Sequence, residues 1–109
     1  MADVVSRLKI ERIRSSAHLE WIRSLPCSVS GCRRRSWAHH LTCGPEPKAR
    51  SLKAGDNWTA PLCTIHHGPG YPASLHAFGD ERRWWAGQGI DPIDLCRRLW
   101  AASPENERT

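Results

Sequence analysis

Two short pairs of cysteine and histidine residues constrain this 109-residue chain more than any other feature. Cys27 and Cys32 stand at the two ends of the tight turn CSVSGC, and Cys63 is followed three residues later by His66. Tetrahedral zinc is commonly held by closely spaced thiolate and imidazole ligands of this kind. The alternative is that these are small buried residues, since free cysteine often lies in a core. Ligand type and spacing favour a structural zinc site formed by all four residues.

The length and composition of the chain suit a small domain that a metal helps to stabilise. A chain of 109 residues is one domain with a modest core. Five cysteines are an odd number, which fits a closed disulfide framework poorly and favours a cytoplasmic, metal-binding protein. No long apolar run is present, so neither a membrane span nor a secretory signal is expected. The net charge of +5 suits a nucleic-acid partner.

The pattern of apolar residues predicts an α+β domain. The expected elements are helices over residues 16–25, 79–89 and 91–102 and strands over residues 37–41 and 58–63. Ser16 is expected to cap the first helix and Pro26 to end it, while Asp91 and Pro92 are expected to begin the last. The segment 4–14 fits a strand or a helix equally well.

The sequence also predicts the boundaries of the domain and some residues of its core. We expect an N-terminal arm over residues 1–15, the domain over residues 16–101 and a frayed tail over residues 102–109. Cys96 falls on the apolar face of the last helix and is expected in the core, whereas Cys43 has no predicted role. The six tryptophans are expected mainly to pack inside the domain rather than to stack on bases.

Several motifs together resemble one known superfamily. The succession PCSVSGC, AHHL, DNWTAPLCTIHH is similar to that of the HNH endonucleases, whose ββα-metal finger is often braced by a zinc knuckle. HLEWIRSLPC and GDERRWWAGQGIDPIDLCRRLW extend the similarity to small phage and bacterial HNH proteins related to the phage recombination-enhancement nuclease Ref. It covers residues 12–100, and it makes a phage or prophage origin plausible. The resemblance implies a small, treble-clef-like zinc-braced finger flanked by an N-terminal helix and two C-terminal helices.

The resemblance also divides the work between two neighbouring histidines. It implies that His39 is a ligand of a catalytic metal and that His40 is the general base. Successive side chains of a strand point to opposite faces, and a histidine is largely neutral near pH 7, so this division is chemically reasonable. A reversed assignment, or a structural role for one of the two, is the alternative.

The other catalytic residues follow from the same resemblance. His67 would be a second metal ligand, and His76 the third if the segment GPGYPAS forms a bulged loop; otherwise Asp80 or water would complete the site. Asn57 is assigned to the middle position of the motif, with Asp56 as the alternative. A mostly imidazole site is compatible with Mg²⁺, Mn²⁺, Ni²⁺ or Zn²⁺ as the single catalytic divalent metal.

Two functions remain open at this stage. The first is a metal-dependent DNA endonuclease that hydrolyses phosphodiester bonds, and the second is a zinc-stabilised nucleic-acid-binding module with a decayed nuclease site. Basic residues near the predicted strand and loop are candidates for phosphate contacts, or else a solvated basic face. They are Arg33, Arg34, Arg35, Lys48, Arg50 and Lys53. The sequence leaves the oligomeric state open.

Overall fold

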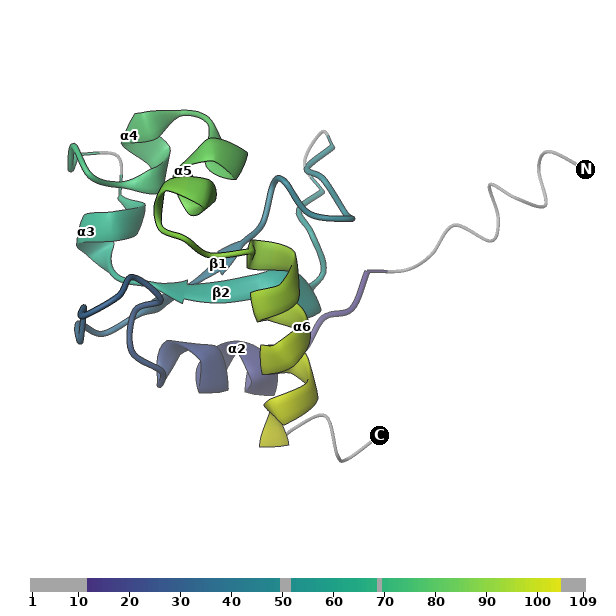
Figure 1. The fold of residues 1–109 in the computed structure, drawn as a ribbon. Helices are drawn as coiled ribbons and strands as arrows, with labels where there is room; N and C mark the ends of the chain where they lie inside the picture. Colours follow the sequence, from purple (N-terminus) through teal and green to yellow (C-terminus); the bar gives the residue numbers. More distant parts are fainter. Residues whose placement is uncertain (1–11, 50–51, 69, 105–109) are drawn as a thin grey trace, which may run out of the picture.

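A two-stranded antiparallel sheet lies at the centre of the fold, with helices on either side of it (Figure 1). The computed structural model describes residues 12–49, 52–68 and 70–104. Strand β1 (Trp37–His40) pairs with β2 (Thr59–Leu62), so that Trp37 lies opposite Leu62 and His40 opposite Thr59. The predicted α+β class is confirmed. Most of the ambiguous segment 4–14, as well as Arg50, lies outside the described residues.

Helix α2 (Ser16–Arg23) covers one side of the sheet. Ser16, which was predicted to be the N-cap, is already the first residue of the helix. The N-cap is Ser15, whose hydroxyl accepts a hydrogen bond from the His18 backbone N–H at 3.1 Å, so the assignment of Ser16 was wrong. Ser15 has extended backbone angles and its own N–H is bound by the Asp56 carboxylate at 2.7 Å. This second contact fixes the cap at a position that the local sequence does not distinguish.

In the described part of the chain, four helices follow β2. They are α3 (Thr64–His67), α4 (Leu75–Phe78), α5 (Glu81–Gly87) and α6 (Pro92–Ala102), and a single 3-10 turn η1 (Asp56–Trp58) precedes β2. The beginning of α6 is as predicted, because Asp91 accepts hydrogen bonds from two backbone N–H groups of the first turn. Asp80 caps α5 in the same way. The short helices α3, α4 and α5 gather on the side of the sheet away from α2 (Figure 1).

The core lies where the sheet meets α5 and α6. Trp85, Leu62 and Cys96 are fully buried there, which confirms the expectation for Cys96. Trp84 is buried as well. Trp37 is different: it is 57% exposed, so the expectation that the tryptophans mainly pack inside does not hold for it.

Both ends of the described chain are held against the domain. Arg12 donates to the carbonyl oxygens of Pro47 and Lys53, so residues 12–15 of the predicted arm are bound to the loop before η1. At the other end the hydroxyl of Ser103 lies 2.9 Å from Nδ1 of His18, and both residues are fully buried. The predicted tail therefore starts too early, because α6 includes Ala102 and the buried contact includes Ser103.

No helix in the described parts is long and apolar enough to cross a bilayer.

Candidate metal centres

The four residues predicted to bind zinc come together in the fold. Their sulfur and nitrogen ligand atoms all lie within 4.8 Å of one another. Cys32 Sγ is 3.7 Å from Cys63 Sγ, and Nδ1 of His66 is 3.5 Å from Cys27 Sγ and 3.2 Å from Cys63 Sγ. Zinc with ordinary bond lengths at the centre of a tetrahedron separates its ligand atoms by about 3.8 Å for two sulfurs and about 3.5 Å for sulfur and nitrogen. The donor set and its dimensions therefore fit one zinc ion.

Each ligand pair is held by a tight turn. In the first, the Cys32 N–H donates to Val29 O at 2.9 Å, next to Gly31, whose positive φ of 80° disfavours other residues. Ser28 ties this turn to β2, because its N–H and its hydroxyl both donate to Pro61 O. In the second, Cys63 is the N-cap residue of α3 and His66 stands three residues later on the same helix. The sheet thus brings two local turns together.

The protonation of the cysteines is consistent with a cation site. Burial raises the pKa of Cys27 to about 11, so this thiol keeps its proton when no cation is near. Burial also opposes ionisation of Cys63, but hydrogen bonds from the His66 backbone and neighbouring thiols outweigh it and lower the pKa of Cys63. Zinc binds thiolates, so its binding would release protons from this cluster.

Three further histidines converge at a second cluster. His39 Nδ1 lies 3.1 Å from His67 Nε2, which in turn lies 3.2 Å from His76 Nε2, and all three nitrogens lie within 4.8 Å of one another. A metal bound to two imidazoles at ordinary distances holds their nitrogens apart by about 3.0 Å in octahedral geometry and about 3.4 Å in tetrahedral geometry. The three imidazoles therefore also fit one divalent ion.

The place of His76 depends on the segment between α3 and α4. In its described part, Ser74 N–H donates to Tyr71 O, and the Ser74 hydroxyl caps α4 by accepting from the Ala77 N–H. Trp84 donates its indole N–H to Ala73 O at 3.0 Å, which fixes the loop against α5. His76 is consequently brought to His67 across the loop. Asp80, the alternative ligand, uses its carboxylate to cap α5.

Glu81 supports this cluster and was not found from the sequence. One carboxylate oxygen lies 2.8 Å from His39 Nε2 and also accepts the Trp85 indole N–H at 2.8 Å, while the other accepts the backbone N–H of Thr42. Burial would raise the pKa of Glu81, but hydrogen bonds with His39, the Thr42 hydroxyl and the Trp85 indole outweigh it and lower the pKa to about 2. An ionised carboxylate only accepts, so His39 carries its proton on Nε2 and directs the lone pair of Nδ1 toward the other two histidines.

His67 is held in its neutral form. Burial, together with the neighbouring His39 and His76, lowers the pKa of His67 to about 4, while Glu81 opposes them. A neutral imidazole is the form that binds a metal. The cluster is open on one side, because His39 is buried, His67 is partly buried and His76 is exposed.

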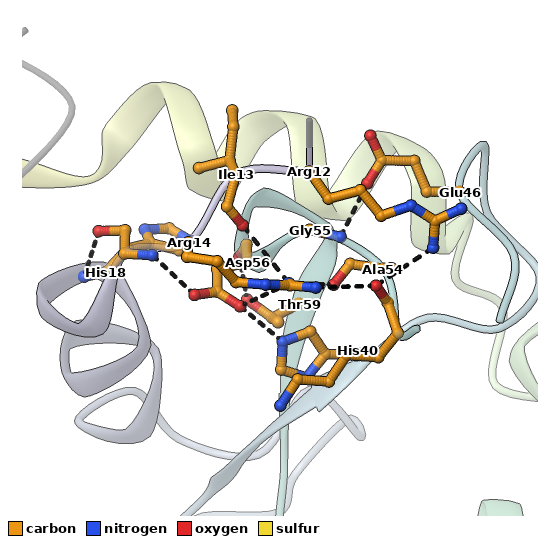
Figure 2. A network of polar contacts seen from close by, with 12 residues as sticks. Arg12, Ile13, Arg14, His18, His40, Glu46, Ala54, Gly55, Asp56 and Thr59 are labelled. Carbon is orange, nitrogen blue, oxygen red and sulfur yellow. Dashed lines mark hydrogen bonds and ion pairs between the residues drawn. The ribbon is translucent and has the colours of Figure 1, made fainter. Parts of the chain in front are cut away.

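His40 has a different partner from its neighbour. Its Nε2 lies 2.8 Å from Oδ1 of the buried Asp56, whose carboxylate also accepts from the Ser15 N–H and from Arg14 (Figure 2). Burial would raise the pKa of Asp56, but His40, the Ser15 N–H and Arg14 outweigh it, so the pKa is lowered. Burial lowers the pKa of His40 as well, against the effect of Asp56.

Asp56, named above as the alternative to Asn57, makes the hydrogen bonds to His40 and Ser15. The side-chain oxygen of Asn57 is buried and has no hydrogen-bond partner among the described residues. The difference has a physical reason: Asp56 begins η1 and faces both the N-terminal residues and β1, so its two oxygens connect three segments. One residue further along the turn, Asn57 reaches neither His40 nor Ser15 through a recorded hydrogen bond.

The basic residues predicted to contact phosphates all lie at the surface where they are described. Arg33, Arg34 and Arg35 are exposed immediately before β1, and Lys48 and Lys53 are exposed in the loop before η1. The backbone carbonyl of Lys53 additionally binds Arg12 and Arg14.

The fold and the site define a small α+β protein with two histidine-containing clusters that could each hold a metal ion. The chain belongs to the family described as protein of unknown function DUF968, whose family model matches residues 2–100. No curated protein matches the chain. No solved structure matches it either.

Proposed function

We propose that this protein is a metal-dependent DNA endonuclease of the HNH type. The order of elements supports the proposal, since two antiparallel strands, β1 and β2, are followed directly by the short helix α3. The cysteine-rich cluster joins the turn before β1 to the start of α3, which is consistent with the resemblance to a zinc-braced finger. In this proposal Cys27, Cys32, Cys63 and His66 bind a structural zinc ion.

One observation carries the proposal. Three imidazoles, from β1, α3 and α4, place their nitrogen atoms close enough together to bind one metal ion. His40, the neighbour of His39, is hydrogen-bonded to the buried carboxylate of Asp56. A metal site alone is common in structural domains. A metal site beside a carboxylate-paired histidine is an arrangement suited to hydrolysis.

His39, His67 and His76 would hold the catalytic ion, which when bound supplies Lewis-acid stabilisation of the leaving 3′ oxygen. His40 takes the proton of the attacking water. Because the pKa of Asp56 is lowered, Asp56 only accepts, so His40 donates Nε2–H to it and keeps Nδ1 as the proton acceptor. As the water oxygen bonds to phosphorus and the bond to the 3′ oxygen breaks, Asp56 stabilises the imidazolium that forms.

The test is an incubation of the purified full chain with supercoiled, linear duplex and single-stranded DNA, each with Mg²⁺, Mn²⁺, Ni²⁺ or Zn²⁺. The proposal expects cleavage of at least one DNA form that requires an added divalent metal. A His40→Ala protein purified in parallel controls for contaminating nucleases. Binding without cleavage of any form under any of these metals would overturn the endonuclease and favour the alternative, a zinc-stabilised nucleic-acid-binding module.

A further inference from the structure

An exposed tryptophan begins β1. Trp37 is 57% exposed, and its indole N–H donates to the hydroxyl of Thr64 on α3 at 3.0 Å. The N–H is the only polar group of this side chain, so the surface left open to solvent is apolar ring. The hydrogen bond also fixes the ring between β1 and α3. The exposed face of a ring held in this way is available for stacking on another planar group.

This ring borders a depression with a basic wall. The depression has a volume of about 340 Å³ and is lined by Arg23, Arg35, Ser36, Trp37 and Thr64. A second one, lined by Arg33 and Arg34 among others, shares Arg23 and Arg35 with it, so the two adjoin. The Ser36 hydroxyl is buried and has no hydrogen-bond partner among the described residues, which is costly unless something else satisfies it.

The positive charge of this surface is not neutralised by neighbouring acids in the described part of the chain. The arginine ion pairs recorded there are Arg14 with Asp56 and Arg98 with Asp94. Arg23, Arg33, Arg34 and Arg35 take part in none of them, and all four are exposed. Uncompensated arginines next to an aromatic ring are the combination with which proteins bind single-stranded nucleic acid.

Trp37 lies on the same face of β1 as the histidine cluster. Trp37 and His39 are two residues apart on β1, so their side chains share one face of the strand at a separation of about 6.6 Å along it. Thr64, which holds the ring, stands three residues before His67 on α3 and so on the same side of that helix. A strand of nucleic acid bound at Trp37 can therefore reach the cluster within one or two nucleotides.

We propose that Trp37, Arg23 and Arg35 form a subsite for an unpaired nucleotide, with the base stacked on Trp37 and the flanking phosphates bound by the arginines. The substrate of the proposed nuclease is then a single strand, or a duplex with a single-stranded part, next to the cleaved bond. A continuous duplex offers only phosphates to this surface, since its bases are already stacked on one another. This inference rests on the proposed function for its position beside the metal, but not for the binding itself.

The test compares binding of the full chain to a labelled single-stranded oligonucleotide and to a duplex of equal length, by fluorescence anisotropy without added divalent metal. The unmutated chain is expected to prefer the single strand. Trp37→Ala is expected to weaken single-strand binding by roughly 5- to 150-fold, the range for loss of one base–aromatic stack, while Trp37→Phe keeps most of the affinity. Duplex binding is expected to change little in both variants.

Salt dependence tests the arginines. Arg35→Ala is expected to lower the slope of log affinity against log salt concentration by about 0.7 for the single strand, as for one lost phosphate contact. Arg98→Ala, an exposed arginine of α6 paired with Asp94, is the matched control and is expected to leave the slope unchanged. Zinc content and thermal melting of each variant show that the fold is retained.

Three outcomes separate this inference from the proposed function. The subsite is overturned, even if the protein cuts DNA, when Trp37→Ala binds single strands as well as the unmutated chain does or when the unmutated chain prefers the duplex. The exposed surface around Trp37 would then be a contact for a protein partner. Weakened binding by Trp37→Ala in a protein that cuts no DNA supports the subsite and removes the nuclease. Weakened binding together with metal-dependent cleavage supports both.

Discussion

His39 and His40 are adjacent in the chain and yet have separate partners. His39 is bound by Glu81 on one side of β1, and His40 is bound by Asp56, which is held in turn by the N-terminal residues. Because neither carboxylate contacts the other histidine through a recorded hydrogen bond, the two imidazoles can be altered one at a time. Single substitutions should therefore distinguish a metal ligand from a proton acceptor.

His40→Ala is expected to keep the zinc, the fold and DNA binding but to lose cleavage by roughly 10²- to 10⁴-fold, the usual contribution of a positioned general base. His39→Ala removes a ligand, so its cleavage should recover in part when the divalent metal is raised. Nicking of supercoiled DNA over a metal titration measures both. A His40→Ala protein that nicks DNA at the unmutated rate would contradict this assignment. If His39→Ala is inactive and added metal does not restore its activity, His39 is instead the general base and His40 the metal ligand.

Glu81 gives a second prediction at the scale of one residue. Glu81→Gln preserves the size of the side chain but can present an amide N–H to His39, so the tautomer of His39 is no longer imposed. The affinity of the histidine cluster for Mn²⁺ or Ni²⁺ is expected to fall by roughly 10- to 100-fold, as for other lost carboxylate partners of metal-binding histidines. Isothermal titration of the zinc-loaded protein measures it.

The matched control for that variant is Glu20→Gln, an exposed glutamate on α2 that is expected to leave both metal affinities unchanged. The zinc content of Glu81→Gln should equal that of the unmutated chain, since Glu81 makes no recorded contact with the cysteine cluster. Equal Mn²⁺ affinity in Glu81→Gln and the unmutated chain would show that Glu81 does not position His39.

Among the secondary-structure elements, α3 holds one ligand of each cluster on consecutive residues. His66 faces the cysteines, and His67 faces His39 and His76. His66→Ala is therefore expected to lose zinc and destabilise the whole domain, whereas His67→Ala should retain zinc and behave like His39→Ala. Zinc analysis with thermal melting of the two variants makes the comparison. Equal destabilisation by both would contradict the separation of the clusters.

Local sequence patterns predicted those elements whose ends are decided locally. The start of α6 follows from Asp91 and Pro92 alone, and the spacing of Cys27, Cys32, Cys63 and His66 predicted residues that the fold does bring together. The cap of α2 was misplaced because a distant carboxylate, Asp56, holds the true one.

Two residues of the candidate site could not be predicted because their roles arise from tertiary contacts. Glu81 resembles any acidic residue in the first turn of a helix, and only the packing of α5 against β1 reveals its hydrogen bonds to His39 and Thr42. Trp37 fell under the general expectation that the six tryptophans mainly pack inside the domain. Trp37 is the first residue of β1 and is exposed, whereas His39 on the same face is buried, so alternation within this four-residue strand does not show which side chain meets solvent.

For the whole molecule, the proposed zinc site would be a main source of stability because the core is small. Elemental analysis of protein purified without added metal is expected to find about one tightly held zinc per chain. Removal by a strong chelator should loosen or unfold the domain, which circular dichroism follows, because binding and folding are coupled in small metal domains. A Cys27→Ser or Cys63→Ser protein that stays folded and retains zinc would count against this assignment.

The alternation of side chains along β1 limits how the gene can change. Trp37 and His39 share one face of this strand, and His40 lies on the other. Insertion or deletion of one codon between Trp37 and His39 would move the tryptophan to the opposite face from the metal ligand. The loop that follows β1 is exposed at Pro45, Pro47 and Lys48, and exposed loops tolerate changes in length better than paired strands do. Related genes should therefore keep the length of the segment SWAHHL unchanged and vary in the loop that follows it.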